Sequence, residues 1–305
     1  MRPWLRNLLI VLVLIGAAGG GLYYWFVLES GSPSGTYAID MAEVRRLAGS
    51  LPGDKPASIR VERVAAFQFP STALVAGDGW NVFNLDVYSY QLVFPTGTAI
   101  IDAAMDQKLG EAMGTTAFDA DAYARMSAAM AKASFIAITH EHPDHIGGIS
   151  SQSDVKALFP QLRLTQEHLD HPEKMGPAAF KPGALDGYRP FVYEKYAALA
   201  PGVVLIKAPG HTPGSQLIYV QIADGTEFLF LGDVAWRMRN VETMRTRARL
   251  VSQFFLAEDR DAVLAELKEL NRLAAVEPGL KMVAGHDPKP VDDLVQARLM
   301  TKGFE

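Results

Sequence analysis

The sequence predicts an α/β protein with two packed β-sheets and outer helices, preceded by one apolar N-terminal helix that spans a membrane. Strand patterns occur in two runs, at residues 59–102 and 203–231, and helical patterns follow each run. Such runs are typical of two sheets packed face to face with helices outside. A stretch without formal charge, residues 7–28, precedes both runs and is long enough to cross a bilayer.

Composition narrows the classes of function. The 305 residues are 49% hydrophobic and include seven histidines and no cysteine, with a formal net charge of -5. This content supports a large core and excludes intrinsic disorder, collagen-like repeats and disulfide scaffolds. The mild acidity argues against neutralisation of phosphates, so no nucleic-acid partner is expected. Because cysteine is absent, thiolate metal ligands and a cysteine nucleophile are excluded too.

Residues 7–28 predict a single-pass anchor in the cell membrane, in contact with the lipid bilayer. At about 1.5 Å per residue, a helix of this length crosses the roughly 30 Å hydrocarbon core. Arg2 and Arg6 precede the segment and aromatic residues 23–26 end it, so the catalytic domain is expected on the extracytoplasmic side. Two alternatives are a signal peptide cleaved near residues 16–18, which would give a secreted protein, and a buried core helix.

We expect three regions: the transmembrane anchor at residues 1–29, a linker and short helix at 30–57, and the catalytic domain at 58–305. The segment Glu29–Thr36 is small and polar and contains proline and glycine, as linkers do. Asp40 is a typical N-cap residue, with Glu43 at the capping-box spacing, so the short helix should begin there.

The catalytic region contains strand and helix patterns in alternation. The first run predicts strands at Ile59–Phe69, Leu85–Phe94 and Thr98–Asp102, then a helix at Ala120–Ala133 and a strand at Ser134–Thr139. The second run predicts strands at Val203–Lys207, Gln216–Ile222 and Glu227–Leu231. A helix at Asp259–Ala275, a strand at Leu280–Ala284 and a helix at Val291–Met300 complete the pattern.

The clearest chemical motif follows the strand at residues 134–139. His140, His142, Asp144 and His145 place three imidazoles and a carboxylate within six residues. Histidines two apart on a strand face opposite sides, but a loop, which Pro143 favours, can fold both rings onto one cation. Imidazole nitrogens with a few carboxylate oxygens suit zinc, and also manganese or iron. The motif therefore predicts a metal site rather than a solvated loop.

Three further residues of ligand type lie directly after predicted strands. They are His211, Asp233 and His286, each beside a glycine. A single histidine in such a place is more often structural, but the arrangement repeats three times. Because strand ends at one edge of a sheet bring scattered residues together, we expect these side chains to join the first motif.

With these residues in place, the sequence resembles the metallo-β-lactamase-fold hydrolase superfamily over roughly residues 58–290. The resemblance implies a four-layer αβ/βα sandwich with the site at one edge of the two sheets. It implies one metal ion held by His140, His142 and His211. It implies a second held by Asp144, His145 and His286, with Asp233 bridging the two. It also implies that Asp102 supports the site.

The implied ligand set predicts a dinuclear hydrolase of an ester or lactone of a small molecule. Two cations about 3.5–4 Å apart lower the pKa of a shared water, so a metal-bridging hydroxide is the expected nucleophile. Asp144 is the expected catalytic proton relay. The expected cofactors are two divalent ions, zinc first and manganese or iron as alternatives. Alternative functions are a thioesterase or phosphoesterase of the same fold, or a non-catalytic membrane-tethered binding protein.

The motifs around His211 and His286, Gly-His-Thr-Pro-Gly and Gly-His-Asp-Pro, are similar to the lactonase and glyoxalase-II-like branch. In this chain only 19 residues follow His286, which is too few for the helical module that glyoxalase-II-like thioesterases carry there. Asp233 disfavours β-lactam hydrolysis. Many signal lactonases have a tyrosine three residues after the bridging aspartate, where this chain has Trp236. An indole N–H donates a hydrogen bond but exchanges no proton at useful pH.

Other side chains carry weaker expectations. An apolar wall of the substrate pocket is expected from Phe180, Tyr188, Phe191, Tyr193 and Tyr196. Five arginines predict either a partner for an anionic substrate group or a basic face against water or anionic lipid: Arg237, Arg239, Arg245, Arg247 and Arg249. His168 and His171 are expected on a solvated helix. Glu141 is expected to point away from the metals, and Asp287 either to orient His286 or to face water.

Overall fold

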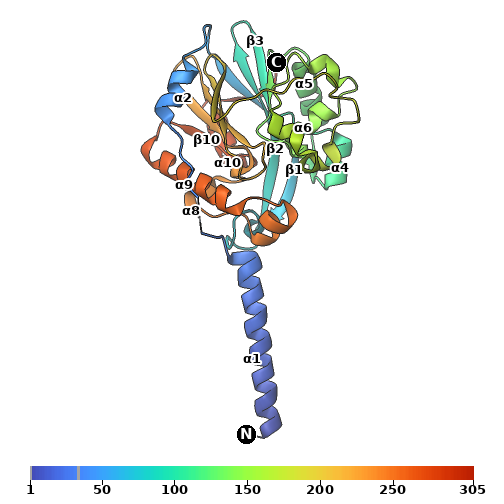
Figure 1. Ribbon diagram of the computed structural model, residues 1–305, viewed down its shortest axis with the longest axis vertical. Coiled ribbons are helices and arrows are strands. Elements are labelled where there is room, and N and C mark those ends of the chain that lie inside the picture. Colours follow the sequence, from blue (N-terminus) through green and yellow to red (C-terminus); the bar gives the residue numbers. More distant parts are fainter. Residues whose placement is uncertain (1, 33–34) are drawn as a thin grey trace.

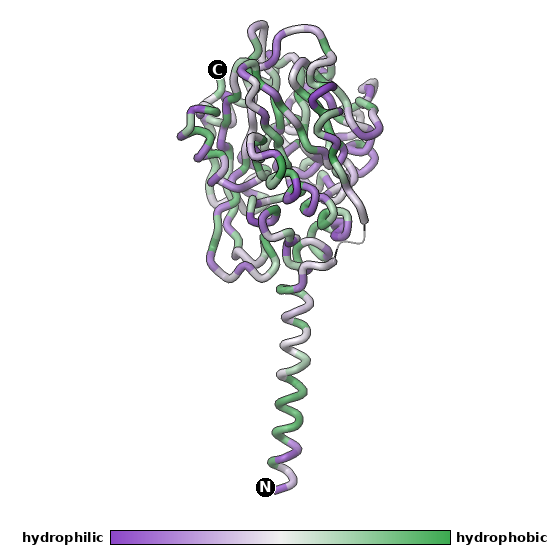
Figure 2. Tube along the Cα trace, turned by 90° about the vertical axis from the view of Figure 1, so that its left-hand side faces the viewer, coloured by the Kyte–Doolittle hydropathy of each residue, from purple (hydrophilic) through white to green (hydrophobic). Residues whose placement is uncertain are grey.

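In the computed structural model, which describes residues 2–32 and 35–305, one long helix leaves the end of a layered α/β domain (Figure 1). Helix α1 (Pro3–Tyr23) continues into a π-helical turn, η1 (Tyr24–Leu28). None of these residues is buried, and the middle of α1 is strongly hydrophobic (Figure 2). The buried core helix is therefore wrong, whereas a membrane anchor and a signal sequence both fit.

The first sheet has six strands. Its order is β11-β1-β2-β3-β5, with β4 also paired to β1. The bounds are β1 Ser58–Pro70, β2 Val82–Phe94, β3 Gly97–Ile101, β4 Ala117–Phe118, β5 Ile136–Ala137 and β11 Thr301–Lys302. The three strands predicted in the first run are confirmed as β1, β2 and β3. The strand predicted at residues 134–139 is shorter, because only the two residues of β5 pair with β3.

The second sheet has five strands in the order β10-β9-β8-β7-β6. The bounds are β6 Tyr196–Ala200, β7 Val203–Lys207, β8 Gln216–Gln221, β9 Glu227–Phe230 and β10 Lys281–Val283. The predicted strands are confirmed as β7, β8, β9 and β10. The edge strand β6 was not predicted, because its sequence, Tyr-Ala-Ala-Leu-Ala, lacks the β-branched residues that mark strands.

The two sheets pack face to face, and helices cover both outer surfaces, which confirms the predicted four-layer sandwich. The core between the sheets joins residues such as Val61 and Leu92 of the first sheet to Leu205 and Val220 of the second. Helices α4 (Gln107–Met113), α5 (Ala120–Met130) and α6 (Pro143–Ser150) pack on the outer face of the first sheet. Helices α2 (Met41–Ala48) and α9 (Arg260–Val276) pack on the second.

The remaining elements are short and lie between these layers and at their edges. They are α3 Ser71–Leu74, α7 Gln166–Asp170, α8 Met238–Thr243, α10 Pro288–Gln296, η2 Val155–Leu158, η3 Pro172–Ala178, η4 Gly232–Val234 and η5 Leu250–Phe255. The C-terminal helix was predicted at residues 291–300. It begins earlier, after Asp287, whose carboxylate accepts a hydrogen bond from the backbone N–H of Lys289 at 3.2 Å.

Aspartates begin several helices, as their residue type predicts. The Asp40 carboxylate accepts hydrogen bonds from the N–H groups of Ala42 at 3.0 Å and Glu43 at 3.1 Å, which confirms the start of α2. Glu43 does not turn back toward the cap, because its carboxylate pairs with the Arg46 guanidinium at 2.6 Å.

The chain directly after α1 is docked onto the domain. Arg245 Nη2 donates to the Leu28 carbonyl at 2.8 Å, and the Thr246 N–H donates to Ser30 Oγ at 2.9 Å. Glu29 forms ion pairs with Arg249 and, at 3.3 Å, with Arg260. The expected linker therefore begins with residues that have fixed partners, while Pro33 and Ser34 within it lie outside the described residues.

Candidate metal centre

The His140–His145 motif spans the junction between β5 and α6. His142 is the N-cap of α6, and Pro143 occupies the first turn, where its missing N–H has no helical partner to lose. This turn therefore replaces the loop expected at Pro143 and directs Asp144 and His145 from a helix. Close packing of α6 requires Gly148, because a Cβ there would lie 2.0 Å from the Ala103 carbonyl oxygen.

The other three predicted ligands follow strands, as expected. His211 lies in the turn after β7, Asp233 in η4 after β9, and His286 in the turn between β10 and α10. The segments meet at very short range: a Cβ on Gly285 would lie 2.4 Å from Asp233 Oδ1. The edge of the two sheets thus brings all seven predicted ligands together.

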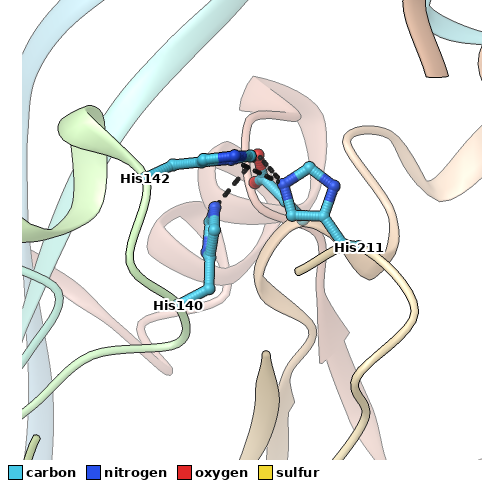
Figure 3. A group of neighbouring side chains, drawn as sticks. His140, His142 and His211 are labelled. Carbon is cyan, nitrogen blue, oxygen red and sulfur yellow. Dashed lines mark hydrogen bonds and ion pairs between the residues drawn. The ribbon is translucent and has the colours of Figure 1, made fainter. Parts of the chain in front are cut away.

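The seven side chains form two groups. The first is His140, His142, His211 and Asp233, and the second is Asp144, His145 and His286, with the ligand atoms of each group within 4.8 Å of one another. The imidazoles of the first group point toward a common centre (Figure 3), and His211 Nε2 lies 2.8 Å from His142 Nδ1. This division is the one that the resemblance implied for two metal ions.

Asp233 lies between the two groups, and each of its oxygens faces one of them. Its Oδ2 is 3.6 Å from His140 Nε2 and 3.4 Å from His211 Nε2. Its Oδ1 is 3.4 Å from His145 Nε2 and 3.0 Å from His286 Nε2. One carboxylate is therefore positioned to serve both groups.

The donor atoms fit divalent cations. Within the described residues, His140 Nε2, His145 Nε2 and Asp233 Oδ1 are buried without a hydrogen-bond partner. Leaving a buried polar atom unpaired costs about 1–3 kcal/mol, so three at one point indicate that something else satisfies them. Imidazole nitrogens and carboxylate oxygens are common ligands of divalent ions.

Burial controls the protonation of the histidines in the first group. It lowers the pKa of His142 to about 4 and the pKa values of His140 and His211 well below the ordinary range. These rings are therefore neutral near pH 7, the form that binds a metal. In the second group, burial also lowers the pKa of His145, but the Asp102, Asp233 and Asp144 carboxylates outweigh it and raise that pKa.

The second nitrogen of several rings has a partner that fixes its orientation. His145 Nδ1 lies 2.9 Å from Asp102 Oδ2, so the supporting carboxylate that the resemblance implied contacts a predicted ligand. His211 Nδ1 lies 2.5 Å from Glu258 Oε1, and His286 Nδ1 lies 2.8 Å from the Asp86 carbonyl oxygen. Sequence reasoning missed Glu258 and Asp86, since neither residue belongs to a motif.

Trp236 and Arg247 contact Asp233. Trp236 Nε1 donates to Asp233 Oδ2 at 2.5 Å, and Arg247 donates to the Asp233 carbonyl. The Arg247 guanidinium also lies 4.4 Å from the Trp236 ring centroid and pairs with Glu258 Oε1 at 2.7 Å. Arg247 is fully buried, so neither a solvated basic face nor a free partner for substrate describes it.

The other four arginines also have partners within the protein. Arg237 and Arg239 both pair with Asp78 at 3.2 Å, and Arg245 and Arg249 contact residues 28 and 29 at the end of η1. The basic run is thus a set of internal contacts that join the segment after Asp233 to the rest of the protein.

Several further expectations need correction. His168 is buried rather than solvated, because its Nδ1 accepts from the Thr165 N–H at 3.0 Å and its Nε2 donates to the Gly214 carbonyl at 2.8 Å. His171 is partly exposed, with 39% of its side chain accessible. The five aromatic residues expected in one pocket wall pack instead against three different cores: Phe180, Tyr188, Phe191, Tyr193 and Tyr196.

Glu141 and Asp287 support backbone near the centre. Glu141 points away from the first group, as expected, and accepts from Thr212 Oγ1 at 2.8 Å, which fixes the turn of His211. Asp287 neither contacts the His286 ring nor faces water. Its carboxylate is buried and accepts from the Met238 N–H at 3.0 Å.

Comparisons with known proteins agree with this architecture. A family model described as the metallo-beta-lactamase superfamily matches residues 84–286. Among solved structures, an N-acyl homoserine lactone hydrolase with product bound at its catalytic metal centre is similar, with TM-score 0.60, 16% identity and coverage of 78% of this chain and 96% of that one. A probable metal-dependent hydrolase from Staphylococcus aureus has TM-score 0.59, 14% identity and coverage of 77% and 91%.

A dizinc quorum-quenching lactonase in complex with a product has TM-score 0.53, 14% identity and coverage of 77% of this chain and 90% of that one. At such low identity, these three structures establish a shared fold only. No curated protein matches the sequence.

Proposed function

This chain belongs to the metallo-beta-lactamase superfamily, and on that premise we propose that it is a dinuclear metal-dependent hydrolase of an ester or lactone of a small molecule. The observation that carries the proposal is the position of Asp233, with one oxygen toward each group of ligand-type side chains. A binding protein has no need for two such groups joined by a shared carboxylate.

The proposed cofactors are two zinc ions, with manganese and iron as alternatives. One ion would be held by His140, His142 and His211 and the other by Asp144, His145 and His286, with Asp233 shared. When bound, the ions would supply Lewis acidity to the substrate and lower the pKa of water. Neutral imidazoles with carboxylates form a donor set that suits zinc.

Asp144 is the proposed catalytic residue that moves protons. Its side chain is 12% exposed, against 2% for Asp233, so it is the more accessible of the two carboxylates. Its Oδ2 lies 3.5 Å from His286 Nε2, so Asp144 contacts the second group of ligand-type side chains and is also partly open to solvent. A carboxylate in this position can accept a proton from the attacking water and return it to the leaving group.

Trp236 is proposed to orient the Asp233 carboxylate rather than to contact the substrate. Its N–H already donates to Asp233 Oδ2, so it has no second proton to offer a carbonyl oxygen. This chain therefore requires another way to polarise the carbonyl than the tyrosine of many signal lactonases. Ester and lactone probes test the proposal directly, because lactone hydrolases are among the proteins with a similar fold.

We also propose that residues 1–29 anchor the chain in the cell membrane and that residues 58–305 form the catalytic domain on the extracytoplasmic side. Residues 30–57, a linker and short helix, would connect the two. The 26-residue stretch Pro3–Leu28 supports this proposal, because it is long, apolar and unburied. A secreted protein, released by cleavage of this segment, is the alternative. The intact mass of the mature protein separates the two.

The test of function uses the full chain in detergent. Metal analysis after gentle purification should find two transition-metal ions per chain, and a panel of lactone, ester, thioester and phosphodiester probes should show hydrolysis of the first two. Asp144→Asn should reduce the rate by about 100-fold or more, since proton transfer contributes about 10²–10⁴. Asp170→Asn, at an exposed helical site, is the matched control.

Each contrary outcome has a distinct meaning. Fewer than one metal ion per chain contradicts the dinuclear centre. Turnover of thioester or phosphodiester alone contradicts the substrate class, and undiminished turnover by Asp144→Asn removes that residue from the mechanism. Two metal ions with no turnover of any probe would favour the membrane-tethered binding protein.

A further inference from the structure

Exposed apolar side chains surround the point where α1 joins the domain. Trp80, which precedes β2, is 62% exposed, and Val82, the first residue of β2, is 66% exposed. Leu250 is 55% exposed, Phe254 56% and Phe255 79%, and all three belong to η5. These five residues, here termed the apolar rim, are too large and too exposed to be explained by packing within this chain.

The rim is held at a fixed height along α1. Trp80 Nε1 donates to the Tyr23 hydroxyl at 3.2 Å, and the two rings stack with centroids 6.4 Å apart. On the η5 side, the Phe254 centroid lies 6.0 Å from that of Trp25 and 5.6 Å from that of Phe26. Trp80 and Phe254 are therefore level with residues 23–26, and the other three rim residues lie within four positions of them in the sequence.

That height coincides with the boundary of a membrane. At about 1.5 Å per residue, Tyr23 lies about 25 Å from Arg6 along the helix and Phe26 about 30 Å. A hydrocarbon core is also about 30 Å thick. If Arg6 lies at the near boundary, residues 23–26 and the rim beside them reach the far boundary. A tilted helix would bring the rim deeper.

The charges next to the rim do not oppose this placement, because they have partners. Arg245 donates to the Leu28 carbonyl at 2.8 Å, and Arg249 pairs with Glu29 and lies over the Trp25 ring at 4.6 Å. Aromatic rings with one polar atom, such as the Trp80 indole, are typical of the headgroup level of bilayers.

We propose that the apolar rim inserts into the bilayer boundary on the side of the membrane away from Arg6, so that the catalytic domain rests on the lipid surface. The partner is the lipid bilayer itself, because an apolar helix of spanning length leaves one end of the domain (Figure 1), and the end of that apolar stretch contacts Trp80 and Phe254. The rim adds a second membrane contact to the helix. This inference rests on the proposed anchor of residues 1–29 but requires no catalytic activity, so it can fail independently of the proposed hydrolase.

The test measures the surroundings of Trp80 in the full chain, reconstituted in phosphatidylcholine vesicles and with intact mass confirmed. Replacing Trp4 and Trp25 by phenylalanine leaves Trp80 and the buried Trp236 as the fluorophores. Lipids brominated near the headgroup end of the acyl chain should quench more than half of the Trp80 emission, and aqueous acrylamide should quench little of it. Trp80→Phe in the same background gives the contribution of Trp236.

Removing apolar contacts should shift Trp80 toward water. Phe254→Ser with Phe255→Ser should lower quenching by brominated lipid and raise quenching by acrylamide, each at least twofold. Val192→Ser, at a 74% exposed apolar site before β6, should change neither. Quenching of Trp80 by acrylamide but not by brominated lipid would overturn the proposal. Protection from both quenchers would also overturn it, since a protein surface, including a second copy of this chain, would then cover the rim.

Discussion

Replacement of Trp236 by phenylalanine is expected to weaken metal binding by about 10- to 140-fold. The indole N–H donates to Asp233 Oδ2 at 2.5 Å in a buried site. A hydrogen bond to a charged acceptor contributes about 1.5–3 kcal/mol, and every 1.4 kcal/mol is about tenfold in affinity. Without this donor, the carboxylate oxygen that faces His140 and His211 is no longer held in orientation, so the loss should appear in metal affinity.

The assay is competition for metal between a fluorescent chelator and the full chain in detergent, with thermal unfolding measured in parallel. The smaller ring should lower the free energy of unfolding by about 1–2 kcal/mol, which leaves the protein folded. Trp80→Phe removes an exposed indole that donates to Tyr23 and should leave the affinity unchanged. A Trp236→Phe protein that is folded and binds metal within twofold of the wild type would refute the reasoning.

Three further predictions follow from named contacts. Asp102→Asn removes the carboxylate 2.9 Å from His145 Nδ1 and should lower the affinity for one of two metal ions by about 10–100-fold, measured by metal titration. Gly148→Ala should lower the free energy of unfolding by about 1–3 kcal/mol or more, measured in denaturant, because the new Cβ would meet the Ala103 carbonyl at 2.0 Å. Burial lowers the pKa of His168 to about 3, so below the ordinary value of 6.5 the unfolded chain binds a proton that the folded chain does not. Stability is therefore present above that pH and is lost as the pH falls, and the wild type should lose about 2 kcal/mol more than His168→Gln between pH 7 and pH 5.

Matched substitutions control for general effects. Asp170→Asn and Gly279→Ala alter the same residue types at exposed positions, and His171→Gln does so at a partly exposed one. A Cβ on Gly279 would meet nothing within 4 Å. Each should behave as the wild type. Retention of both metal ions by Asp102→Asn would contradict the supporting role of that carboxylate. Equal pH dependence of the wild type and His168→Gln would show that the buried ring does not set acid stability.

The seven side chains of the candidate metal centre could be predicted to lie together because their sequence signals are local. His140, His142, Asp144 and His145 lie within six residues, and His211, Asp233 and His286 each follow an apolar strand. Strand ends at one edge of a sheet bring scattered residues together, so these positions predicted that the side chains would meet, and the resemblance implied their division into two groups. The role of Asp102, which also ends a predicted strand, was implied by the resemblance alone.

The supporting residues could not be predicted because their partners are distant along the chain. Glu258 reaches His211 across 47 residues and has no motif around it. Arg247 occurs in a run of arginines that reads as a solvated surface, yet its buried pairing with Glu258 decides its role. His168 was misjudged because a short polar helix normally faces water, and only the approach of the Gly214 carbonyl shows otherwise.

The docking of residues 28–30 limits how this protein can be shortened. A soluble fragment that begins at residue 37 would lack Glu29, whose carboxylate pairs with Arg249 and Arg260. Arg260 is buried and donates to the Arg247 carbonyl at 3.3 Å, and Arg247 in turn donates to the Asp233 carbonyl. The cut would therefore remove an ion-pair partner from a chain of contacts that leads to Asp233. The same cut would strip Phe254 of its aromatic neighbours. Poor solubility or weak metal binding of such a fragment would reflect the choice of truncation site rather than a property of the full chain. A fragment that retains residues 28–30 would keep these contacts.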